Sequence, residues 1–154
     1  MSSGAPSGGP IGRRRARRAA APHPPHVKLG TLQDLSLAPA LAAIIDRGVQ
    51  RRPSVAARLN TEIELKVEGP YPPVRIVFSP GGILVEDGHA IDPQLKVEGS
   101  LTDIISLMVT PTFGGVPSPV RSKGARAIRQ VMFGQVRVEG RIGLMRRLLA
   151  LLRF

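Results

Sequence analysis

The chain has 154 residues, no cysteine and a formal net charge of +11, which excludes disulfides, thiolate nucleophiles and cysteine-bound metals. The charge is uneven: residues 1–30 hold six basic residues and no acid, residues 31–120 hold seven basic and ten acidic residues, and residues 121–154 hold nine basic and one acidic. An anionic partner, such as a membrane surface, a nucleic acid or an acidic protein, would therefore meet the two ends.

Residues 1–28 differ from the rest of the chain in composition. They are rich in Gly, Pro, Ser and Arg, and they hold one Ile, one Val and no aromatic residue. Such a segment cannot bury enough apolar surface to offset the entropy lost on ordering. We therefore expect a disordered tail over residues 1–28 and one folded domain over residues 29–154. No apolar stretch follows the arginines and no run of 18 apolar residues occurs, so we expect no signal peptide, no membrane span and a cytoplasmic location.

The first predicted element is a helix that ends at a proline. Its apolar positions, led by Leu35 and including Leu41, Ile45 and Val49, recur at helical spacing. A proline at position 39 is suited to the first turn, and Pro53 ends the main helix. One or two further helical turns are expected up to residue 60.

Four strands follow in the sequence. Residues 61–69 alternate between apolar and charged side chains, which is typical of a strand with one buried face. Residues 72–78, 83–88 and 93–99 continue the pattern, and Gly81 and Gly82 suit the turn between the first two of these.

The period then changes to that of a helix. Residues 101–109 carry a helical apolar stripe, and Ser100 and Asp103 have the spacing of a capping box. A Pro/Gly-rich connection spans residues 110–120, a second helix is predicted over residues 121–133, and residues 135–140 form a fifth strand. An amphipathic helix over residues 141–154 closes the chain. The pattern predicts an α+β fold: a five-stranded, mostly antiparallel sheet with helices packed on one face.

Two blocks of this sequence resemble a known family. They read ILVEDGHAIDPQLKVEGSLTDIISLM and GQVRVEGRIGLMRRLLALL, and the late strand has Gly134, Val136, Val138 and Gly140 at the family's spacing. Over residues 31–154 the chain resembles the sterol carrier protein type-two domain. The resemblance implies an apolar tunnel between sheet and helices that holds sterols, fatty acyl chains or other lipids, without chemistry of its own. The low aromatic content favours acyl chains or isoprenoids over sterols.

The resemblance also implies which side chains would contact the lipid. The predicted lipid-binding residues are Leu101, Ile104, Ile105, Met108, Phe113, Val131, Met132, Phe133, Leu144 and Leu148. The alternative is that these residues fill a solid core, and the sequence pattern alone fits both.

The closing helix has a leucine-rich half opposite an arginine-rich half, and no acid follows Glu139. A helix docked on a sheet would show the same wheel, but a solvated face usually mixes charges of both signs. We therefore predict that Arg146, Arg147 and Arg153 contact an anionic membrane.

No other site is predicted. The sequence lacks nucleophile and phosphate-loop motifs, so we expect no enzyme activity and no cofactor. His23 and His26 lack the further ligands that zinc needs, so no metal is expected. The repeated glutamates Glu68, Glu98 and Glu139 fit either a carboxylate site or outward-facing strand positions, and alternation favours the second.

Two functions from different classes follow. The first is a non-enzymatic lipid carrier that exchanges an apolar ligand with an anionic membrane, as a cytoplasmic protein with a peripheral membrane contact. The second is a solid-cored interaction module whose basic ends dock an acidic protein or nucleic acid. Nucleic acid is the weaker of these partners, because the chain has one tyrosine and no recognition motif.

Overall fold

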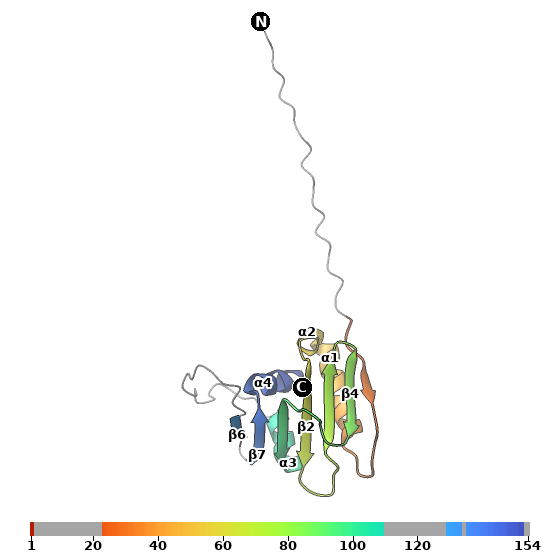
Figure 1. Cartoon of the computed structure of the whole chain (residues 1–154), viewed down its shortest axis with the longest axis vertical. Coiled ribbons are helices and arrows are strands. Elements are labelled where there is room, and N and C mark those ends of the chain that lie inside the picture. Colours follow the sequence, from red (N-terminus) through yellow and green to blue (C-terminus); the bar gives the residue numbers. More distant parts are fainter. Residues whose placement is uncertain (2–22, 110–128, 134, 153–154) are drawn as a thin grey trace.

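The computed structural model describes residues 1, 23–109, 129–133 and 135–152. In these ranges seven strands form a single sheet, in the order β1-β4-β3-β2-β5-β7-β6, and four helices accompany it (Figure 1). The elements are β1 (Val27–Leu29), α1 (Ala38–Arg51), α2 (Pro53–Ala56), β2 (Thr61–Val67), β3 (Val74–Ser79), β4 (Gly82–Asp87), β5 (Leu95–Gly99), α3 (Leu101–Val109), β6 (Arg129–Phe133), β7 (Val136–Gly140) and α4 (Ile142–Leu152).

The predicted α+β class and the mostly antiparallel sheet are confirmed. Antiparallel pairs join β2 to β3, β3 to β4, β5 to β7 and β6 to β7, whereas β1–β4 and β2–β5 are parallel. The three similar segments LKVEG, LKVEG and VRVEG overlap the neighbouring strands β2, β5 and β7, so the sequence repeat marks the centre of the sheet.

The predicted count of five strands is wrong, because two strands were missed. Residues 129–133 were predicted to continue a helix over residues 121–133, but they form β6. Phe133 is the register partner of Val136, so a two-residue connection makes β6 and β7 a tight hairpin. The apolar positions of this short segment fit both periods, and backbone pairing with β7 decides between them. The rest of the predicted helix lies outside the described residues.

The other missed strand, β1, begins at Val27, inside the segment predicted as tail. It is three residues long, too short to show alternation, and it lies at the edge of the sheet. Backbone bonds hold it to β4: Ile83 N donates to the His26 carbonyl at 2.8 Å, and Gly30 N donates to the Val85 carbonyl at 2.9 Å. The ordered domain therefore starts at or before Val27, ahead of the predicted boundary at residue 29.

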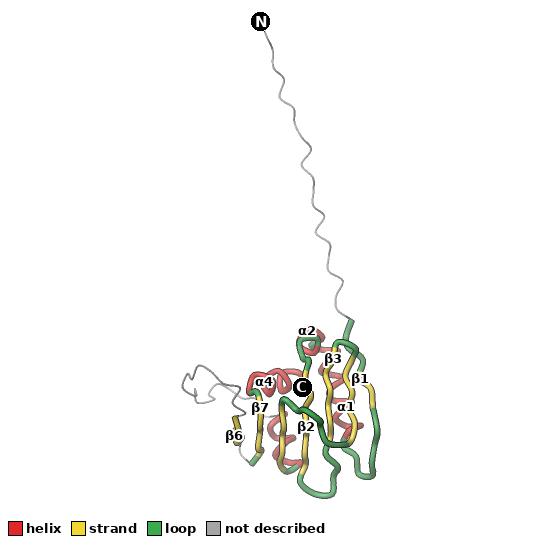
Figure 2. The backbone as a smooth tube through the Cα atoms, viewed as in Figure 1, coloured by secondary structure: helices red, strands yellow, loops and turns green. Residues whose placement is uncertain are grey.

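One face of the sheet is buried beneath helices and the other is open. The strands alternate as predicted, and Figures 1 and 2 show the helices on one side of the sheet. The buried face presents Ile63, Leu65, Val67, Val74, Ile76, Phe78, Ile83, Val85, Leu95, Val97, Val136 and Val138. The helices pack on this single apolar layer.

Helix α1 begins at Ala38, so Pro39 lies in its first turn as predicted. Ser36 Oγ accepts a hydrogen bond from Ala38 N and donates one to Asp87 Oδ1, which fixes the entry into α1. Leu35 lies outside the helix, with a φ of +59° and 62% of its surface exposed, so its assignment to the helical stripe is wrong. At the other end, Pro53 lies in the first turn of α2, so the main helix ends where predicted.

Helices α1 and α4 are joined at their C-terminal ends. Arg52 Nη1 donates to the Ala150 carbonyl at 2.9 Å, across 98 positions of sequence. The backbone of Leu151 lies so close to Gly48 that a Cβ there would be 2.2 Å from the Leu151 carbonyl oxygen. A glycine in α1 thus allows the two helices to approach closely, and an arginine satisfies a carbonyl in the last turn of α4.

Candidate functional site

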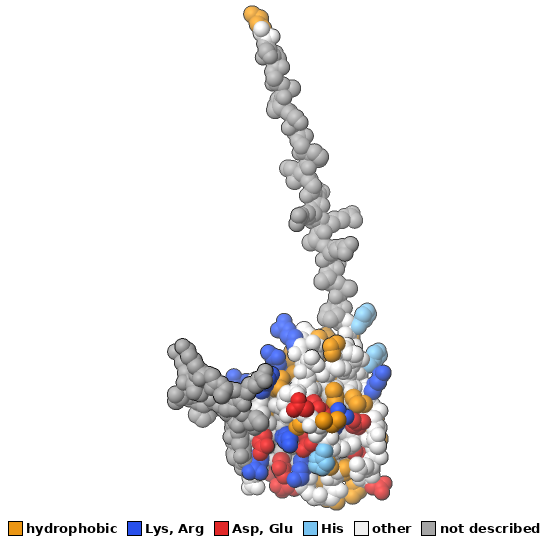
Figure 3. Space-filling view, in the orientation of Figure 1, with side chains coloured by type: hydrophobic (Ala, Val, Ile, Leu, Met, Phe, Trp, Pro, Cys, Tyr) orange, Lys and Arg blue, Asp and Glu red, His pale blue; other side chains and the backbone are white. Residues whose placement is uncertain are grey.

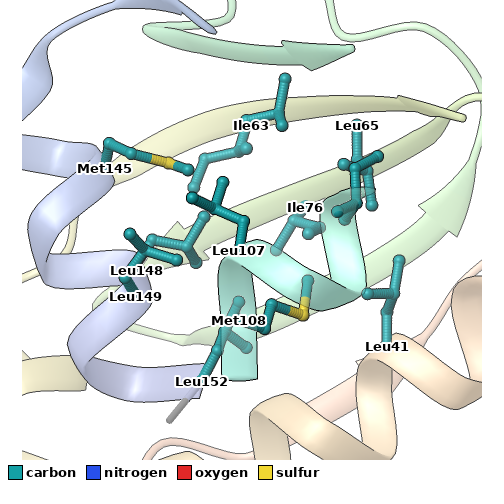
Figure 4. A pocket seen from close by; sticks show the side chains of 12 residues that line it. Leu41, Ile63, Leu65, Ile76, Leu107, Met108, Met145, Leu148, Leu149 and Leu152 are labelled. Carbon is teal, nitrogen blue, oxygen red and sulfur yellow. The ribbon is translucent and has the colours of Figure 1, made fainter. Parts of the chain in front are cut away.

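A small apolar cavity lies between the buried face of the sheet and helices α1, α3 and α4. Its volume is about 30 Å³, which is the space of about one water molecule. Its lining consists of Leu41, Ile63, Leu65, Ile76, Val97, Ile104, Leu107, Met108, Met145, Leu148, Leu149 and Leu152 (Figure 4). No polar side chain and no aromatic ring belongs to this set, so the cavity suits a saturated or branched hydrocarbon and no charged group.

Each wall of the cavity comes from a different part of the chain. The floor is formed by inward-facing residues of β2, β3 and β5, which strand alternation places on one face. Leu41 of α1 closes one side. Helix α4 contributes Met145, Leu148, Leu149 and Leu152 from its buried stripe.

Helix α3 provides the remaining wall, and it is only partly buried. Of its side chains that the structure describes, Ile104 alone is buried, at 3% exposure. Leu107 and Met108 are half-buried, and Figure 4 shows Leu107 on the side of α3 that faces α4 and Met108 on the side that faces Leu41 of α1. The first turn of α3 is capped by the predicted pair of residues: Asp103 N donates to Ser100 Oγ at 3.1 Å, and Ser100 Oγ donates to Asp103 Oδ2 at 2.5 Å, in place of the backbone bond of a full capping box.

The structure brings some of the predicted lipid-binding residues together and separates others. Ile104, Met108 and Leu148 line the cavity. Leu101 and Leu144 pack against the core beside it. Ile105, in contrast, is 50% exposed, so the prediction that it faces the ligand is not supported by its position.

Four predicted residues cannot be assigned to the site. Val131, Met132 and Phe133 belong to β6 rather than to a helix, and the structure describes only their backbone. Phe113 lies outside the described residues.

Sequence reasoning missed the whole floor of the cavity and part of the walls that the helices contribute. The missed residues are Leu41, Ile63, Leu65, Ile76, Val97, Leu107, Met145, Leu149 and Leu152. Their signals were present, because strand alternation and the leucine stripe of α4 place them on buried faces. Nothing in either pattern indicates which buried residues border an empty space.

Two of the three arginines predicted to contact a membrane, Arg146 and Arg147, lie on the side of α4 opposite its buried leucines. Arg146 and Arg147 are exposed, and Arg153 lies outside the described residues. Ala150 lies four positions after Arg146 and three positions after Arg147, so it is on the same side of α4 as these arginines. Arg52, which donates to the Ala150 carbonyl, therefore reaches this side of α4.

Acidic and basic side chains are mixed on the open face of the sheet (Figure 3), and the strand register places them in two rows of alternating charge. The first row crosses five strands through the register partners Glu86, Arg75, Glu64, Lys96 and Glu139. The second row consists of Lys66, Glu98 and Arg137. Four acids and four bases cancel, so the positive charge of the domain lies elsewhere. A hollow of about 300 Å³ on this face has three acids and three bases in its walls, which favours no ionic ligand of one sign.

The central pair of the second row shows how closely these charges are matched. Lys66 Nζ donates to Glu98 Oε1 at 2.9 Å, and this hydrogen bond raises the pKa of Lys66 and lowers the pKa of Glu98. Glu139 lies 3.8 Å from Arg137, and Glu68 is exposed just after β2. The repeated glutamates therefore occupy outward-facing or exposed positions, and the prediction based on alternation is confirmed.

Glu62 and Glu64 hold the segment of the chain that crosses this face of the sheet. Residues 88–94 connect β4 to β5 and must pass over β3 and β2, because β5 lies beside β2 in parallel (Figure 1). Glu62 accepts hydrogen bonds from Ile91 N and Asp92 N, and Glu64 accepts one from Ala90 N. These carboxylates have a structural role in fixing the crossover.

The described part of the chain offers neither a metal site nor a helix able to span a membrane. It contains no group of three His, Asp or Glu side chains able to hold a metal ion. No helix in it has the length and apolar character needed to cross a bilayer.

Comparisons with known proteins agree with this geometry. No family model and no curated protein matches the sequence. Among solved structures, the chain is similar to a protein described as "UbiJ-SCP2 Ubiquinone synthesis protein", with a TM-score of 0.51 and 15% identity over 75% of this chain and 88% of the other. At this identity the likeness concerns the fold. The chain therefore has the fold of an SCP2 sterol-carrier domain, as the sequence resemblance predicted.

Proposed function

We propose that the protein is a non-enzymatic carrier that holds an apolar lipid chain between its sheet and its helices. The observation that carries this proposal is a cavity whose twelve lining side chains are all apolar, at the helix–sheet interface of an SCP2 fold. Transfer of an apolar chain into such a site is favourable by about 25 cal/mol per Å² of buried surface.

The chemistry of the lining narrows the ligand class. A rigid sterol gains from flat aromatic surfaces and a hydrogen-bond partner for its hydroxyl, and the lining offers neither. Leucine, isoleucine and methionine side chains adapt instead to a flexible chain. A fatty acyl or isoprenoid chain fits this set best. Because the SCP2 neighbour is named for ubiquinone synthesis, an isoprenoid quinone is a sensible probe.

Exchange of the ligand would take place at an anionic membrane. Helix α4 carries exposed Arg146 and Arg147 on one side and four cavity-lining residues on the other. A bilayer that attracts the arginines would thus lie next to the element that covers the ligand. In this proposal the carrier is cytoplasmic, and its membrane contact is peripheral and transient.

One observation favours the second candidate function. The cavity holds about 30 Å³, whereas sites for ligands of this kind usually hold about 300–1,000 Å³. A domain with so little internal space would serve as an interaction module whose basic surfaces dock an acidic protein.

Native mass spectrometry of the protein purified from cells separates the two candidates. The carrier proposal expects a co-purifying lipid, and it expects the purified protein to take up a fluorescent fatty acid or an isoprenoid quinone. Failure to detect lipid in repeated preparations, together with no uptake of either probe, would leave the interaction module as the better account.

A further inference from the structure

The cavity is too small to hold an acyl chain. The 30 Å³ cavity present in the structure is about a tenth of the smallest usual ligand site, so it has no room for a whole acyl chain. If the domain carries a lipid, some of the lining must leave its place. The walls of the cavity differ in how firmly the rest of the domain holds them.

Helix α4 is poorly suited to move. Five of its side chains are buried, and its C-terminal end is tied to α1 by the Arg52 bond and by the close approach at Gly48. The strands of the floor are held by their ladders of hydrogen bonds. Displacing either wall would break many contacts at once.

Among the described residues, the side-chain hydrogen bonds that hold helix α3 lie in its first turn. The cap ties Ser100 to Asp103, and Ile104 N bonds the Ser100 carbonyl. Beyond Ile104, the described side chains of α3 are exposed or half-buried. The side chains that leave the cavity when this half of the helix moves are Leu107 and Met108.

We propose that Leu107 and Met108 form a plug that occupies the ligand site in the empty domain. The lipid chain binds where these two side chains now lie, and α3 pivots about its capped first turn to admit it. The lipid chain then covers the apolar surface of β2, β5 and α4 that the plug now covers. The free energy gained by filling the site therefore compensates for the free energy lost when α3 moves. This inference rests on the proposed carrier function and adds the position of the ligand.

The plug can be removed without touching the floor. The variant Leu107→Ala with Met108→Ala enlarges the cavity, and Ile105→Ala is the matched control because it shortens an exposed side chain of the same helix. Binding to wild type requires the open state, so its apparent affinity is reduced by the fraction of molecules that are open. If about a tenth are open, the double variant should bind a fluorescent fatty acid about tenfold more tightly, and the control should match wild type.

Movement of α3 can be measured directly, because the chain has no cysteine to interfere with labelling. Spin labels at Ile105→Cys and Gln50→Cys report the distance between α3 and α1, and labels at Gly143→Cys and Gln50→Cys report α4 as a control. Adding palmitate should lengthen the first distance and leave the second unchanged.

The outcomes separate this inference from the function on which it rests. Palmitate uptake with an unchanged α3 distance, or with no gain in the plug variant, would overturn the plug and leave the carrier function standing. No uptake by wild type or by the plug variant, even though the enlarged cavity binds xenon, would overturn both. Uptake with a longer α3 distance and tighter binding by the variant would support the plug.

Discussion

Gly48 shows how a single residue can set the distance between two helices. A Cβ at this position would lie 2.2 Å from the Leu151 carbonyl oxygen and 3.0 Å from its carbon, and both atoms belong to the backbone. The helices would have to separate to admit a methyl group. We therefore expect Gly48→Ala to destabilise the domain by about 1–3 kcal/mol in urea denaturation, as overpacked sites usually do.

Gly143 provides the matched control, because it is exposed in α4 and a Cβ there would meet nothing within 4 Å. Alanine is the better helix former, so Gly143→Ala should raise the free energy of unfolding by about 0.5–1 kcal/mol. Equal effects of the two substitutions would show that the close approach of α1 and α4 is not needed.

The Glu62 carboxylate should make stability depend on pH. Burial raises its pKa, but hydrogen bonds from Ile91 N, Arg75 and Asp92 N outweigh this, so that the pKa falls below its ordinary value of 4.5. A lowered pKa in the folded state adds stability that is fully present above about pH 5 and is lost as the pH falls through the folded value. The stability of wild type should therefore fall with acid below pH 4.5.

The variant Glu62→Gln tests this dependence. At pH 7 it should be less stable by roughly 1–3 kcal/mol, because the charged hydrogen bonds to the crossover are lost. Its stability should also change less than that of wild type between pH 5 and pH 3. Parallel acid profiles of the two proteins would show that Glu62 does not hold the crossover.

Within α4, the charged side can be tested apart from the apolar side. Each basic residue near an anionic surface contributes about 1 kcal/mol, so Arg146→Gln with Arg147→Gln should weaken binding to phosphatidylserine vesicles by roughly 30-fold. Binding to neutral vesicles should change little. Co-sedimentation at low salt measures both.

The variant Lys28→Gln with Lys96→Gln removes the same charge from β1 and from the neutral open face, where both side chains are exposed. It should bind anionic vesicles nearly as well as wild type. If it weakens binding as much as the α4 variant does, net charge alone attracts the protein, and α4 has no special part in docking.

The elements differ in how far the sequence predicts them. Strands β2 to β5 and helix α1 were predictable because their alternation or stripe continues over five or more residues. In β6 the same apolar residues fit a helix or a strand, and only pairing with β7 selects the strand. In α3 the stripe predicted an inward Ile105, but the helix is rotated so that Leu107 faces the cavity instead. Such a rotation depends on α4 and the sheet, which local sequence does not describe.

For the domain as a whole, ligand binding and stability must be linked if the carrier proposal holds. A ligand at one hundred times its dissociation constant adds about 2.7 kcal/mol to the free energy of unfolding, which for a domain of this size raises the melting temperature by roughly 10 °C. Palmitate should produce this shift in a thermal scan, and butyrate, which has the same carboxylate and a short chain, should not. Equal shifts would assign the effect to the carboxylate and the basic surface rather than to the cavity.

The pairing of α1 with α4 has a consequence for how the domain folds. Arg52 and Ala150 are 98 positions apart, so the contact between the two helices closes one of the longest loops in the chain. Closing such loops costs entropy before any packing repays it, and proteins rich in distant contacts fold slowly. Until α4 arrives, a growing chain leaves part of the apolar face of its sheet and the side of α1 uncovered. Helix α4 is the last of the described elements in chain order. Its docking therefore covers the apolar surface that would otherwise attract chaperones and promote aggregation.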